Sequence, residues 1–61
     1  MLYKQGDLVQ YKKYQGIVRF AYAENKTYIV TLYAYRGTYR VDKQISQIEL
    51  YPAYEQLAIR V

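Results

Sequence analysis

Two short segments of this sequence interleave cationic side chains with tyrosine rings. The residues concerned are Tyr11, Lys12, Lys13 and Tyr14 in the first segment and Tyr33, Tyr35 and Arg36 in the second, with Arg19 and Arg40 on nearby predicted strands. Cations can hold phosphates while bases stack on aromatic rings. We therefore take these residues as the candidate binding site for nucleic acid or for another partner.

The residue types needed for most catalysis are missing. The chain has no histidine and no cysteine, so it lacks a side chain that titrates near neutrality, a thiolate nucleophile and the usual zinc ligands. Its single serine, Ser46, has no base beside it, and its three glycines do not form a phosphate-binding loop. We expect a protein that is not an enzyme and uses no cofactor or metal.

Length and composition indicate one small globular domain over residues 1–61. Hydrophobic residues make up 52% of the chain and charged residues 23%, with a net charge of +4 and ten tyrosines. Ten tyrosines exceed what so small a core can hold, so several rings should lie at the surface. No apolar run is long enough to span a membrane and no leader is recognisable, so we expect a complete cytoplasmic protein that does not bind membranes.

Alternation of β-branched and aromatic residues with polar ones predicts an all-β fold. The expected strands cover residues 7–11, 17–23, 27–34, 38–41 and 45–51, separated by a basic loop at 12–15 and by breaks at 24–26, 35–37 and 42–44. Pro52 should end the last of them. Two alternatives are open for the C-terminal residues: one helical turn over residues 53–57, or an extra edge strand over residues 57–61 that is able to pair with a second chain.

The same alternation assigns side chains to the two faces of the sheet. The expected core is Val9, Val18, Phe20, Val30, Leu32, Tyr39, Val41, Ile48 and Leu50. The expected outer face is Ile17, Arg19, Ile29, Thr31, Thr38 and Arg40. Five or six short antiparallel strands with tight loops suit a small barrel, because closure protects the edges of the sheet.

Four short motifs follow one another in an order that resembles the SH3-like small barrels, the Tudor and KOW group in particular. They are Gly6-Asp7-Leu8-Val9, Gly16-Ile17-Val18, Tyr28-Ile29-Val30-Thr31-Leu32 and Ile45-Ser46-Gln47-Ile48-Glu49-Leu50, so the resemblance covers residues 6–51. It implies a single SH3-like barrel in which the first and third loops flank one end of the sheet. It implies no one function, because small barrels carry many.

Three binding functions remain open. The first is nucleic-acid binding, with the cations on phosphates and the rings on bases or sugars. The second is a protein-interaction or inhibitor module that uses the same tyrosines and arginines, with homodimerisation as its simplest form. The third is a Tudor-like aromatic cage for a methylated side chain, built from Tyr11 or Tyr14 with Tyr33 and Tyr35. Such cages usually have an asparagine or acidic residue where this chain has Arg36-Gly37-Thr38.

Overall fold

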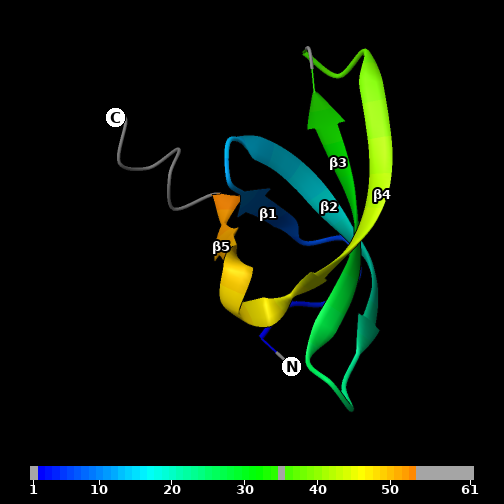
Figure 1. The fold of residues 1–61 in the computed structure, drawn as a ribbon, viewed down its shortest axis with the longest axis vertical. Coiled ribbons are helices and arrows are strands. Elements are labelled where there is room, and N and C mark those ends of the chain that lie inside the picture. The colour runs from blue at the N-terminus through cyan, green and yellow to red at the C-terminus, as the bar shows by residue number, and fades with distance from the viewer. Residues whose placement is uncertain (1, 35, 54–61) are drawn as a thin grey trace.

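The computed structural model describes residues 2–34 and 36–53, and these form the all-β fold that the sequence predicts (Figure 1). The strands are β1 (Leu8–Tyr11), β2 (Tyr14–Tyr22), β3 (Thr27–Ala34), β4 (Tyr39–Ser46) and β5 (Leu50–Pro52), with a 3-10 turn, η1 (Gln47–Glu49), before β5. All pairings are antiparallel, and the single sheet has the order β4-β3-β2-β1-β5. Tyr35 and the expected helical turn or strand beyond residue 53 lie outside the described residues.

The sheet curls so that its two halves face each other across the core. The Nζ of Lys43 on β4 lies 5.4 Å from the ring centroid of Tyr11 on β1, although β3 and β2 separate these strands in the sheet. Figure 1 shows β1 and β5 on one side of the molecule and the long β3–β4 hairpin on the other. Lys43, which is exposed, therefore reaches Tyr11 from the facing half of the sheet.

Two of the predicted interruptions differ from the structure, since one is shorter than expected and the other is absent. The basic loop at 12–15 is only a turn at Lys12 and Lys13, because Tyr14 and Gln15 already pair with β1. The expected break at 42–44 does not exist, since β4 runs without interruption along β3. As an edge strand, β4 can carry polar side chains on both faces. The third strand and the end at Pro52 match the prediction.

The core combines aliphatic side chains with buried tyrosines. Its members are Tyr3, Val9, Tyr11, Val18, Tyr28, Val30, Leu32, Ile45 and Leu50. Gly16 is buried beside these residues, where a Cβ atom would come within 2.7 Å of both the carbonyl oxygen of Thr31 and Cγ1 of Val30. Only glycine lets β2 and β3 pack this closely at that position.

The expectation that Phe20 belongs to the core is wrong, because β2 contains a bulge. Val18 pairs with Val30 but Phe20 pairs with Ile29, so Arg19 is an extra residue in the ladder. An extra residue reverses the faces of everything after it. Phe20 is consequently 54% exposed and packs its ring against Tyr22, while Ala21 turns towards the core.

The expected core positions Tyr39, Val41 and Ile48 are also exposed. Tyr39 and Val41 share the inner face of β4 with Ile45, but they lie towards the end of the β3–β4 hairpin, and only Ile45 is buried. Ile48 lies in η1, where the two-residue period on which the prediction depended does not apply. Thr31 is more buried than predicted: it lies on the outer face, as expected, but is buried there.

A network of hydrogen bonds around Tyr28 attaches the N-terminal segment to the sheet. The hydroxyl of Tyr28 accepts from the backbone N–H of Tyr3 at 3.1 Å and donates to Oε1 of Gln47 at 2.6 Å. The hydroxyl of Tyr3 donates to the carbonyl oxygen of Leu50 at 3.2 Å. Both buried hydroxyls are thus paired, which is the condition for placing them in a core.

Each hairpin turn contains a cationic residue in the left-handed backbone region. Lys12 between β1 and β2 has φ 53°, Lys26 between β2 and β3 has φ 53°, and Arg36 between β3 and β4 has φ 59°. This region is unfavourable for residues with a side chain and usually favours glycine or asparagine. The fold therefore accepts local strain at three positions that carry positive charge.

Candidate nucleic-acid interface

Five residues from three strands and one turn gather three lysines around two tyrosine rings. Tyr11 ends β1, Lys12 and Lys13 form the turn, Tyr14 begins β2, and Lys43 comes from the inner face of β4. The tight turn pairs Tyr11 with Tyr14, which places both rings on the same face of the sheet. We call these five residues the lysine–tyrosine cluster.

Each ammonium group of the cluster lies near the face of a ring. The Nζ of Lys12 is 5.2 Å from the centroid of Tyr11, and that of Lys13 is 5.5 Å from the centroid of Tyr14. Lys43 approaches Tyr11 as well, at 5.4 Å. Cation–π attraction at such distances stabilises each contact by about 0.5–1 kcal/mol where the site is exposed. Tyr11 thus contacts two of the ammonium groups and Tyr14 contacts the third.

Within the described residues, no lysine of this cluster forms an ion pair with a carboxylate. The ion pair of the described residues joins Lys4 to Asp7 in the N-terminal segment, outside the cluster. Asp42 follows Val41 on β4 but points to the opposite face from Lys43, where its carboxylate accepts a hydrogen bond from Thr31. The cluster is therefore a concentration of positive charge whose natural complement is an anion with several charges.

Tyr33 and Arg40 form a fourth cation–ring pair at the same end of the sheet, on its outer face. They lie opposite each other on β3 and β4, and Cζ of Arg40 is 5.8 Å from the ring centroid of Tyr33. Tyr33 also pairs with Gln15, the residue after Tyr14. The register thus brings the first and third loops to one end of the sheet, as expected, but divides the candidate residues between its two faces. Arg36 lies exposed in the β3–β4 turn.

Arg19 belongs to a separate hydrogen-bonded chain. Its Nε donates to Oγ1 of Thr31 at 3.0 Å, and that hydroxyl donates to Oδ1 of Asp42 at 2.5 Å. The Thr31 hydroxyl thus links the Arg19 side chain on β2 to the Asp42 side chain on β4. Among the expected phosphate-binding residues, Arg19 is therefore the one with a structural role in the fold.

Two further differences separate the structure from the sequence interpretation. Tyr11 was expected to present its ring to a ligand, but it is only 6% exposed and instead supports Lys12 and Lys43. Lys43 was not among the expected site residues. Its signal was present in the run Asp42-Lys43-Gln44, where a charge on the inner face interrupts the apolar alternation of β4.

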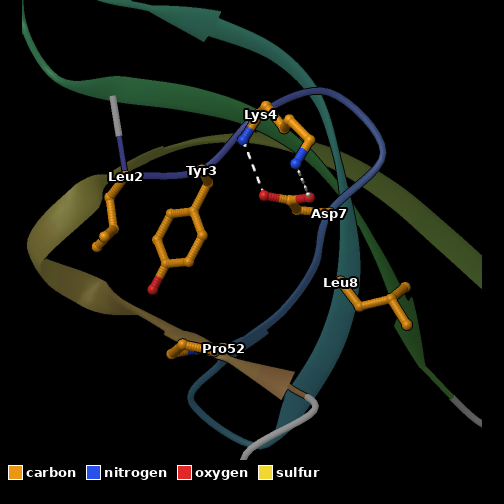
Figure 2. Close-up of a pocket in the computed structure, with 6 residues that line it drawn as sticks. All are labelled: Leu2, Tyr3, Lys4, Asp7, Leu8 and Pro52. Carbon is orange, nitrogen blue, oxygen red and sulfur yellow. Dashed lines mark hydrogen bonds and ion pairs between the residues drawn. The ribbon is translucent and has the colours of Figure 1, made fainter.

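A small pocket lies away from the cluster, between the N-terminal segment and the strands β1 and β5. It has a volume of about 300 Å³ and is lined by Leu2, Tyr3, Lys4, Asp7, Leu8 and Pro52. Figure 2 shows that Asp7 is bound by the backbone and side-chain nitrogens of Lys4, while the hydroxyl of Tyr3 points away from this pair. Its charged groups are thus paired with each other, which makes it a poor site for an anion.

Comparisons with known proteins leave the site to be interpreted from its own geometry. No family model, no curated protein and no solved structure matches this chain. The described residues contain no helix long and apolar enough to cross a membrane, and no group of three acidic residues placed to hold a metal ion.

Proposed function

We propose that this protein is a non-catalytic binding module for single-stranded nucleic acid, and that the lysine–tyrosine cluster is its principal contact with the phosphate backbone. The observation that carries the proposal is that three ammonium groups contact two rings and that none of the three forms an ion pair with a carboxylate of the described residues. Repulsion within such a group of cations raises the electrostatic free energy of the folded chain, and a bound polyanion lowers it.

Aromatic rings at the same end of the sheet favour a single strand over a duplex. Tyr14 and Tyr33 are partly exposed, on opposite faces of the sheet and each beside a cation. Unpaired bases can stack on such rings, whereas paired bases are buried in the helix. A strand that passes around this end would contact the cluster on one face and Tyr33 with Arg40 on the other.

The SH3-like barrel of the Tudor and KOW group remains our proposal for the fold family. The five-stranded order β4-β3-β2-β1-β5, the curl of the sheet and the 3-10 turn before the last strand support it. The aromatic-cage function loses support at the same time. Tyr11 is buried and is already approached by two lysines, so a cationic ligand would be repelled there.

A protein partner is the second candidate function, and one observation favours it. Phe20 and Tyr22 are 54% and 41% exposed on the outer face, with their rings 4.8 Å apart in an edge-to-face arrangement. Exposed aromatic pairs are common anchors of protein interfaces. This surface is distinct from the cluster, so variants can separate the two functions.

Fluorescence anisotropy with labelled single-stranded DNA and RNA tests the proposal. The Lys12→Gln/Lys43→Gln variant should bind more weakly, and the slope of log K against log salt should decrease in magnitude by about 1.4, since each phosphate contact of a single strand contributes about 0.7. The matched control is Lys4→Gln/Lys26→Gln, which removes the same charge elsewhere and should change both quantities much less.

Two results would overturn the proposal in different ways. Equal losses in the two double variants would show that net charge alone, and not the cluster, attracts the oligonucleotide. No binding by the unmodified protein at about 50 mM salt, where screening is weak, would reject nucleic-acid binding altogether. In that case a Phe20→Ala/Tyr22→Ala variant would be used to examine the protein-partner function.

A further inference from the structure

We propose that the exposed edge of β4 pairs antiparallel with β4 of a second copy of this chain, in a register centred on Val41. In the described residues β4 pairs with β3 alone, so the other side of its middle part, from Arg40 to Gln44, faces no strand among them. Tyr39 to Gln44 are all exposed. A long exposed edge of this kind is a template for pairing with another strand.

The two-fold symmetry of such a dimer limits the registers that are available. When two copies of β4 extend one continuous sheet, residues of the inner face lie opposite residues of the inner face. The two-fold axis of the dimer must therefore pass through a residue of β4, because an axis between two residues would place inner-face side chains opposite outer-face ones. Centring on Arg40 places two arginines opposite each other, and centring on Asp42 or Lys43 likewise opposes identical charges. Like charges directly opposite destabilise a strand pair.

Centring on Val41 gives the one complementary arrangement among these registers. On the outer face Arg40 of each copy lies opposite Asp42 of the other, which forms two cross-strand pairs of opposite charge. On the inner face Val41, which is 43% exposed, meets its own symmetry mate. The sequence Arg40-Val41-Asp42 is thus self-complementary about its central residue. Because a single pair of edge strands buries little surface, the dimer should be weak and dependent on concentration.

Sedimentation of the full chain over a wide range of concentrations tests the interface, without nucleic acid present. The unmodified protein should shift from monomer to dimer as concentration rises. Asp42→Arg should raise the dimer Kd about tenfold or more, because two attractive pairs become repulsive. Arg40→Asp should act in the same direction. Glu49→Arg is the matched control, since it makes the same change of charge in η1 and should leave the Kd within about twofold of the unmodified value.

Mixing the two charge variants gives the decisive result. Each alone is self-repulsive, but a heterodimer of Asp42→Arg with Arg40→Asp restores two complementary pairs, so the mixture should dimerise where neither variant does. Circular dichroism establishes that both are folded, and Val41→Lys provides a second way to oppose like charges at the centre. A protein that stays monomeric at all concentrations, or a mixture that fails to associate although the unmodified protein dimerises, would overturn this interface. Arg40 belongs to both proposed surfaces, but the sedimentation contains no nucleic acid, so its result tests the dimer separately from oligonucleotide binding.

Discussion

The hydroxyl of Tyr28 donates a hydrogen bond to Oε1 of Gln47 at 2.6 Å while it accepts one from the backbone N–H of Tyr3 at 3.1 Å. The ring that carries this hydroxyl is completely buried. One atom of β3 therefore joins the N-terminal segment to the turn before β5.

We expect Tyr28→Phe to lower the free energy of unfolding by about 1–3 kcal/mol, because it leaves a buried N–H of Tyr3 without its acceptor. Urea denaturation followed by circular dichroism measures this. Tyr22→Phe is the control, since Tyr22 lies at the surface and loss of its hydroxyl should cost little. Equal stabilities for the two variants would contradict the role assigned to the Tyr28 hydroxyl.

The bulge at Arg19 predicts different costs for two large hydrophobic residues. Leu32→Ala should destabilise by about 2–5 kcal/mol, because Leu32 is buried and its removal leaves a cavity. Phe20→Ala should cost about 1 kcal/mol or less, since its ring is more than half exposed and mainly loses the contact with Tyr22. Chemical denaturation of both variants checks this ranking, and a larger loss for Phe20→Ala would mean that β2 has no bulge.

Gly16→Ala tests the close approach of β2 and β3. The added Cβ would lie 2.7 Å from a backbone oxygen, and a backbone atom cannot rotate away as a side chain can. We expect a loss of about 1–3 kcal/mol or more from overpacking, enough to unfold a large share of so small a domain. Gln15→Ala, at the exposed neighbouring position, should remain near the original stability in the same thermal melts.

The left-handed turn residues allow stability and binding to be separated. Lys12→Gly and Lys26→Gly should each raise the melting temperature, because glycine adopts positive φ without the cost of roughly 1 kcal/mol that a side chain brings. Only Lys12→Gly removes a member of the lysine–tyrosine cluster, so only this variant should also weaken oligonucleotide binding. Scanning calorimetry and anisotropy on the same samples would reveal a failure of either expectation.

Alternation in the sequence was sufficient to predict the strands whose surroundings are regular. Thr27–Ala34 is strand β3, flanked by β4 and β2, and its bounds match the prediction. Val9, Val18 and Val30 follow the two-residue period and are buried as expected. In these places local pattern and tertiary packing favour the same conformation.

The period failed where the backbone leaves a regular ladder or reaches an edge. Nothing in the residues around Arg19 marks it as a bulge, yet that one extra residue moved Phe20 to the opposite face. Along β4 the edge position removes the need for apolar alternation, so Asp42 to Gln44 looked like a break. The prediction of the site failed for a related reason. Lys43 lies near Tyr11 because the whole sheet curls, and this curl is not visible in the local sequence pattern.

The pairing of β1 with β5 has a consequence for the order in which the chain folds. The hairpins β1–β2, β2–β3 and β3–β4 pair strands that are consecutive in the sequence. The pairing of β1 with β5 instead joins Gln10 to Tyr51, near the other end of the described chain. Local hairpins form within about 1–10 μs, and distant pairings wait for the entropy of a long loop to be overcome. We therefore expect β5 to dock last, so that changes in β5 accelerate unfolding more than they slow folding.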